Sequence, residues 1–104
     1  MTNEPFQIIA EAENGEIICY AKLKNCYVSV KGSSFGSFTL KQKQWNTVTT
    51  LPQKYRPSGT FYFSAQNPGG PILIHGSIDG SGVVSLYPME TTAYWVFSLT
   101  FSID

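Results

Sequence analysis

Few side chains in this chain could take part in catalysis. Its 104 residues include one histidine, two cysteines and seven acidic residues. We expect neither the Gly-x-Ser-x-Gly nucleophile elbow nor the His-Glu-x-x-His zinc motif of common hydrolases in this chain. A glycosidase needs two carboxylates at a set separation, and the spacing of the acids selects no such pair. The sequence therefore predicts a protein that is not an enzyme and that needs no cofactor and no metal.

The two cysteines, Cys19 and Cys26, are the only candidates for redox chemistry. If residues 23–25 form the loop of a hairpin, Cys19 lies opposite Ser29 and Cys26 opposite Lys22. Side chains alternate along a strand, so this register places the two thiols on opposite faces of the sheet. We interpret both as buried free thiols, with a disulfide in a different register as the alternative.

Aromatic side chains are the second group with a possible chemical role. The chain has two Trp, six Tyr and seven Phe, and a saccharide site needs flat rings together with a few fixed polar groups. Rings in the apolar phase of a predicted strand are interpreted as core: Phe61, Phe63, Trp95, Phe97 and Phe101. The candidate carbohydrate-binding residues lie in the outward phase, on a turn or on a rigid corner: Tyr62, His75, Asp79, Tyr94 and Arg56.

Each candidate also has a structural alternative. His75 could be an ordinary strand histidine, and Asp79 precedes a glycine as good turn residues do. Arg56 could donate to carbonyl groups left over by the corner, or pair with an acid across a subunit boundary. Tyr55 could lie at the same boundary. Trp45 fits either the core or a stacking platform, and both interpretations stay open.

The elements that must position these residues are organised around residues 45–64, which we expect to form a strand, a rigid corner and a second strand. Pro52 and Pro57 remove two amide donors and fix two φ angles. Residues 51–57 are therefore a stiff corner that cannot join a sheet throughout. Residues 60–63 begin the next strand.

Short strands account for the rest of the chain. We expect a turn at Asn14-Gly15, a loop at residues 32–34, a loop at 66–71 and a turn at 79–82. The closing segment alternates most clearly, with five large apolar residues on one face. The predicted strands are 6–13, 16–22, 26–31, 35–41, 72–78, 83–87 and 94–103. This pattern predicts an all-β domain, a β-sandwich or jelly roll of eight or nine short antiparallel strands. Residues 1–104 form a single domain in this prediction, with 1–5 as a loose N-terminal tail.

Charge and hydropathy exclude some partners. Charged residues make up 13% of the chain, about half the usual share of about 25%, and seven basic residues balance seven acidic ones. No basic patch is visible, so we expect no nucleic acid partner. Apolar runs are far shorter than the roughly 20 residues needed to cross a bilayer, so we expect no membrane insertion. Residues 1–5 lack the features of a signal peptide, which predicts synthesis in a cytoplasm.

A set of motifs points to a family. The core of the set is Trp45 shortly before Leu51-Pro52-x-x-Tyr55-Arg56-Pro57, followed by Phe61-Tyr62-Phe63. The other members are Tyr20-Ala21-Lys22, Val28-x-Val30-x-Gly32, Ile72-x-Ile74 leading to Ile78-x-x-Gly80, and Val84-x-Leu86-Tyr87. Over residues 15–103 the chain resembles the C-terminal head domains of tail-fibre and baseplate proteins from phages of Gram-positive bacteria.

The resemblance implies a role without naming a site. It implies a compact β-sandwich at the tip of a virion tail, assembled as a homotrimer, in contact with other tail or baseplate proteins. Such heads often recognise a host cell-wall or cell-surface saccharide and serve host attachment. Low charge and abundant aromatic residues also suit contact between subunits. The alternatives are a purely structural virion module that trimerises or caps a fibre, and a stand-alone carbohydrate-binding module.

Overall fold

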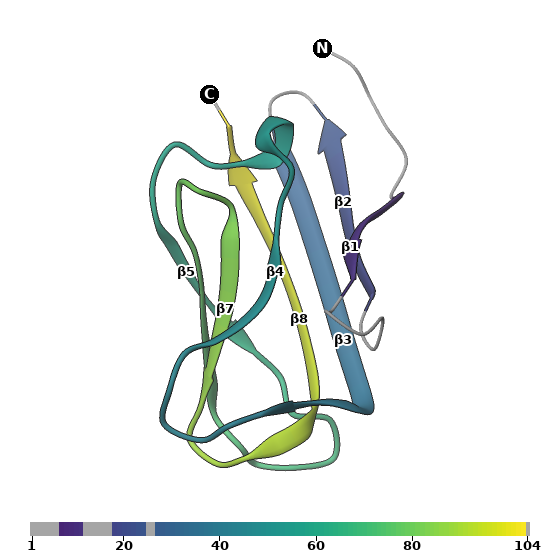
Figure 1. Ribbon diagram of the computed structural model, residues 1–104, viewed down its shortest axis with the longest axis vertical. Coiled ribbons are helices and arrows are strands. Elements are labelled where there is room, and N and C mark those ends of the chain that lie inside the picture. The colour runs from purple at the N-terminus through teal and green to yellow at the C-terminus, as the bar shows by residue number, and fades with distance from the viewer. Residues whose placement is uncertain (1–6, 12–17, 25–26, 104) are drawn as a thin grey trace.

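A computed structural model describes residues 7–11, 18–24 and 27–103 (Figure 1). Two four-stranded antiparallel sheets pack face to face, the first in the order β1-β2-β3-β8 and the second in the order β4-β7-β6-β5. The elements are β1 (Gln7–Glu11), β2 (Ile18–Lys24), β3 (Tyr27–Leu40), β4 (Asn46–Thr50), the 3₁₀ turn η1 (Gln53–Tyr55), β5 (Phe61–Ala65), β6 (Ile74–Ile78), β7 (Val83–Pro88) and β8 (Thr92–Ser102). The predicted all-β sandwich is confirmed, whereas the jelly-roll winding stays a prediction.

The core lies between the two sheets and is built by the alternation of side chains along the strands. Strand β8 turns Trp95, Phe97 and Phe101 inward, as its periodicity predicted, while Leu99 and Ile103 are half-buried against the same core. Trp95 is completely buried, and its indole nitrogen donates to the carbonyl of Phe38 at 3.0 Å. The same core also contains the buried residues Val28, Val30, Leu40, Ile74, Ile78, Val84 and Leu86.

Strand β3 differs from the prediction, which placed a loop at residues 32–34. The strand continues through them because the long partner β8 supplies a ladder, with Gly32 opposite Phe97 and Ser34 opposite Trp95. The hydroxyl of Ser34 is also satisfied in the interior, since it donates to the carbonyl of Ala93 at 2.9 Å. Propensity for a turn is therefore overridden by tertiary pairing.

The predicted register of the hairpin between β2 and β3 is wrong by three positions. Lys24 lies opposite Tyr27, so Cys19 lies opposite Gly32 and not opposite Ser29. The connection is thus shorter than the loop at 23–25 that the prediction assumed. Cys26 and the side chain of Cys19 lie outside the described residues, as does the tail at 1–5, so the interpretation of free thiols stays a prediction.

The proline corner is confirmed and leads into the core. In η1 the amide of Tyr55 donates to the carbonyl of Pro52 at 2.9 Å, and the ring of Tyr55 is buried. The expectation that Tyr55 lies at a subunit boundary is therefore wrong, because the tight turn directs its ring inward. Figure 1 shows η1 at the same end of the sandwich as the C-terminal end of β8.

Strand β5 is an edge strand, and this corrects one predicted core residue. Phe61 remains 40% exposed although its ring stacks on Phe101 at 6.0 Å between centroids. An edge strand has a neighbour on one side only, so its inward side chains are only partly covered. Phe63 is half-buried and its ring lies over Gly76, the residue paired with it on β6.

Candidate functional site

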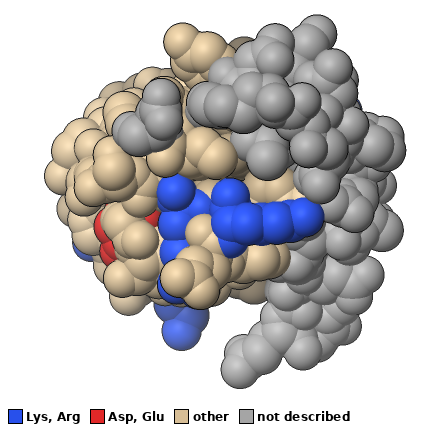
Figure 2. Space-filling model, turned by 90° about the horizontal axis from the view of Figure 1, so that it is seen from above, with Lys and Arg blue, Asp and Glu red and all other residues tan. Residues whose placement is uncertain are grey.

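The five predicted site residues lie in three separate places. Arg56 and Asp79 lie at the end of the sandwich formed by η1 and the β6–β7 turn. Arg56 donates from Nε to the carbonyl of Leu51 at 2.9 Å, and Oδ1 of Asp79 accepts from the amides of Ser81 and Val83. These are the structural roles that the sequence left open for both residues. Figure 2 looks onto this end and shows Lys and Arg side chains gathered there.

Tyr94 lies on the outer face of the first sheet. It is 52% exposed and pairs across the ladder with Phe35, which is 66% exposed. Gly36 follows at a φ of +103°, and a Cβ at that position would lie 3.3 Å from the Tyr94 hydroxyl. The glycine therefore leaves room for the tyrosine ring, and the two rings form an exposed apolar surface.

His75 and Tyr62 lie together on the outer face of the second sheet. The imidazole of His75 is exposed and its centroid is 6.4 Å from that of Tyr87 on β7. Tyr87 in turn lies 5.3 Å from Trp45, which is 49% exposed. We call Trp45, Tyr87 and His75 the outer aromatic row.

A second row of polar side chains runs beside the first. Antiparallel pairing aligns Thr47 with Ser85, Ser85 with Ser77, and Ser77 with Tyr62. Directly opposed residues on neighbouring strands project from the same face, so these hydroxyl groups flank the outer aromatic row. Rings for C–H packing and hydroxyls for hydrogen bonds are thus side by side. Neither of these two described rows contains a carboxylate, and the arrangement suits a neutral polar ligand.

The sequence identified His75 and Tyr62 but missed Tyr87 and left Trp45 undecided. The missing signal is the register of the β6–β7 hairpin. A four-residue turn at 79–82 would pair Ile78 with Val83 and His75 with Leu86, whereas the structure pairs Ile78 with Val84 and His75 with Tyr87. The predicted turn is one residue too short, so extending it along both strands would not have brought the two rings together.

The interpretation that the chain lacks the Gly-x-Ser-x-Gly pattern is wrong at one place. Residues 32–36 read Gly-Ser-Ser-Phe-Gly, which has the spacing of a nucleophile elbow. That elbow requires a sharp turn from a strand into a helix, with the serine exposed. Here Ser34 lies within β3, is buried, and donates to the carbonyl of Ala93. The motif match therefore has no catalytic geometry.

Metal and membrane features can be stated for the described part of the chain. Within residues 7–11, 18–24 and 27–103, no three histidine, cysteine or acidic side chains come together as a metal-binding group. The helical structure in these same ranges has neither the length nor the apolar character of a membrane-spanning segment.

Comparisons with known proteins agree with the fold. No protein-family model and no curated protein matches the chain. Among solved structures, it is similar to the head domain of phage bIL170, a structure concerned with the receptor-binding domains of lactococcal phages. The TM-score is 0.73 at 17% identity, over 96% of this chain and 98% of that one. The chain therefore has the fold of a phage receptor-binding head, as the motif resemblance implied.

Proposed function

We propose that this domain is a phage tail-fibre or baseplate head that binds a host cell-surface saccharide without catalysis. The observation that carries the proposal is the outer aromatic row, Trp45, Tyr87 and His75, beside the hydroxyl row on the second sheet. The fold likeness to a receptor-binding head supports the role. Tyr62 lies within the same surface, whereas Asp79, Arg56 and Tyr94 are proposed as secondary contacts elsewhere.

The exposed rings favour sugar over a large apolar partner. Each ring is accessible only in part, and the hydroxyl row lies along one side of the rings. Saccharide recognition uses rings and polar groups side by side, because the C–H groups of a sugar pack on the rings while its hydroxyls hydrogen-bond to the polar groups. A site this open binds a single sugar weakly, so several copies in one particle would raise the effective affinity.

The proposed homotrimer would bring three binding sites together. Its subunit contacts would also cover the exposed surface on the first sheet. Phe35 and Tyr94 are two exposed rings there that could contact a neighbouring subunit or another tail protein. Light scattering at micromolar concentration should give three times the mass of the chain. A stable monomer would overturn the trimer and would favour a stand-alone carbohydrate-binding module.

The binding test uses the fact that the chain has two tryptophans, Trp45 exposed and Trp95 buried. Purified lactococcal cell-wall polysaccharide, chosen because of the structural likeness, should change the emission of Trp45 in the folded protein. The double substitution Trp45→Phe and Tyr87→Ala removes the reporting indole, so its affinity is measured by calorimetry; it should fall at least tenfold, while Tyr27→Ala on the other sheet should leave affinity unchanged. A folded wild-type protein that binds neither this polysaccharide nor a glycan array would remove the recognition role.

A purely structural module is the second candidate. The exposed pair of Phe35 and Tyr94 favours it, because burying these rings between subunits needs no saccharide. A module that is only structural would have the outer aromatic row covered by neighbouring chains as well as Phe35 and Tyr94, and acrylamide should then fail to quench Trp45 in the assembled protein. Efficient quenching of Trp45 in the assembly would favour recognition instead.

A further inference from the structure

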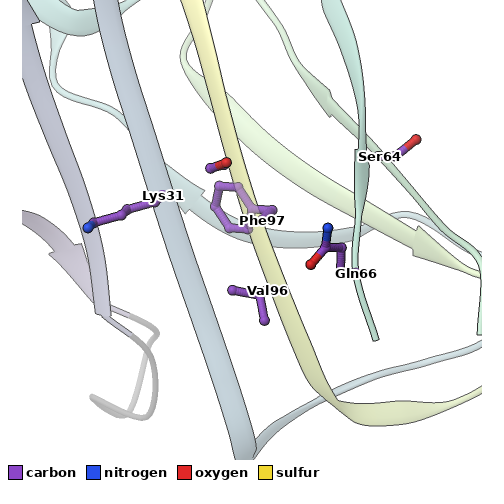
Figure 3. Close-up of a pocket in the computed structure, with 6 residues that line it drawn as sticks. Lys31, Ser64, Gln66, Val96 and Phe97 are labelled. Atoms are coloured by element: carbon purple, nitrogen blue, oxygen red, sulfur yellow. The ribbon is translucent and has the colours of Figure 1, made fainter. Parts of the chain in front are cut away.

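A pocket of about 360 Å³ lies at the seam between the two sheets, next to the edge strand β5 (Figure 3). It is lined by Lys31, Ser64, Gln66, Val96, Phe97 and Ser98. The seam is held by one isolated bridge, in which Gln66 and Val96 exchange two backbone hydrogen bonds of 2.8 and 2.9 Å. In the described residues this single bridge is not extended into a ladder between β5 and β8. Space therefore remains beside it.

The pocket has a polar rim and an apolar floor. Gln66, Ser64 and Ser98 are exposed, whereas Phe97 is buried beneath them. In Figure 3 the amide of Gln66 extends from β5 toward β8, and Lys31 points the opposite way, toward β2. The side chain aimed at the seam is therefore a neutral amide, which can donate and accept hydrogen bonds.

Ser64 connects this pocket to the outer aromatic row. It lines the pocket, and it also pairs with His75, which pairs in turn with Tyr87. Tyr87, His75 and Ser64 thus form one continuous line across β7, β6 and β5. In Figure 3 Ser64 and Gln66 project to opposite sides of β5, so the line passes over this edge strand before it reaches the pocket.

We infer that the saccharide site continues from the outer aromatic row over β5 into this pocket, and that its ligand is a linear, uncharged oligosaccharide. This inference rests on the proposed function. Neighbouring strands lie about 4.8 Å apart, so the line from β7 to β5 is about 10 Å long before the pocket begins. One sugar ring covers roughly one strand spacing. The whole path therefore accommodates about three sugars or more, and a single sugar fills only a part of it.

The first test is a length series. Fragments of one, two, four and six sugars from partly hydrolysed lactococcal cell-wall polysaccharide are titrated against the full chain and followed by Trp45 emission. Affinity should rise at least tenfold between two and four sugars and then level off. Equal affinity for two and six sugars would overturn the extended site while leaving saccharide recognition intact. Absence of binding at every length would overturn both proposals.

The second test locates the far end of the path. Gln66→Ala removes the amide but keeps the backbone bridge, and should lower affinity for four sugars about fivefold, the loss of one hydrogen bond. Its effect on two sugars should stay within twofold. Ser98→Phe should fill the pocket and act in the same direction. Gln53→Ala, an exposed glutamine in η1, is the matched control and should change nothing. An equal effect of Gln66→Ala on short and long fragments would contradict the inference.

Discussion

The core between the two sheets and the outer face of the second sheet carry similar rings in different surroundings. Inside, the centroid of Phe97 lies 5.5 Å from that of Phe63 and 6.0 Å from that of Trp95. Outside, the outer aromatic row has spacings of 5.3 and 6.4 Å. Ring spacing therefore does not distinguish the two sets. The difference is coverage, because the inner rings lie between two sheets and the outer rings face solvent.

Coverage decides what a ring contributes. A buried aromatic side chain removes a large apolar area from water on folding and stabilises the native state by a few kcal/mol. A ring that stays exposed contributes little to folding, and its face remains available to a ligand. Changes on the inner face should therefore alter the free energy of unfolding, and changes on the outer face should alter binding.

Removal of the end of β8 should have the largest effect on the stability of the inner face. Deletion of residues 99–104 takes away Phe101 and the partners of Val28 and Val30 in β3. We expect no cooperative thermal transition by circular dichroism, because the core loses large side chains at several points at once. Deletion of Asp104 alone is the control. A cooperative melt in the longer deletion would contradict the assignment of β8 as the locking strand.

A glycine at the proline corner should give the next largest effect. Gly82 has a φ of +82°, and a Cβ there would lie 2.8 Å from Cγ of Arg56 and 2.9 Å from the carbonyl oxygen of Leu51. Gly82→Ala should therefore lower the free energy of unfolding by about 1 to 3 kcal/mol through strain and crowding. Gly59→Ala is the matched control, since a Cβ at that glycine meets nothing within 4 Å. Equal melting temperatures for the two variants would show that the corner is not tightly packed.

The inner face was more predictable from the sequence than the outer one. The alternation in β8 follows from period two and burial, and it placed Trp95, Phe97 and Phe101 in the core correctly. The stiffness of the proline corner follows from covalent geometry at Pro52 and Pro57. These are local properties, which a sequence expresses directly.

The outer site depends on pairing between distant segments, which local patterns do not express. Trp45 meets Tyr87 only after β4 and β7 pair, and the pocket exists only because β5 meets β8 at one bridge. The error at residues 32–34 has the same origin, since turn-forming residues remain in a strand when a long partner is present. The predicted exposure of His75 and Tyr62 was correct because it needs only the phase of each strand.

Replacement of a buried hydroxyl group should change the free energy of unfolding by a smaller amount, and should raise it. Oγ1 of Thr49, on the inner side of β4, is buried and has no hydrogen-bond partner in the described structure. Thr49→Val replaces it with a methyl group of similar size, so we expect the free energy of unfolding to rise by about 1 kcal/mol. Chemical denaturation measures this directly, with the exposed Thr50→Val as control. Destabilisation by Thr49→Val would mean that a partner satisfies this hydroxyl.

Substitution of the exposed tryptophan should have the smallest effect on stability, in contrast to substitution of the buried one. Trp45→Phe changes a ring that is 49% exposed and lies before β4, so the free energy of unfolding should shift by less than about 0.5 kcal/mol. Trp95→Phe changes a completely buried ring whose indole nitrogen donates to the carbonyl of Phe38, and it should lower the free energy of unfolding by more than about 1 kcal/mol.

Fluorescence of the Trp45→Phe variant tests the same difference between the two tryptophans. Trp45→Phe should abolish acrylamide quenching and leave the blue-shifted emission of Trp95, because the indole that remains is shielded from water. Strong quenching in that variant would place Trp95 in solvent and would remove the distinction between the inner and outer rings.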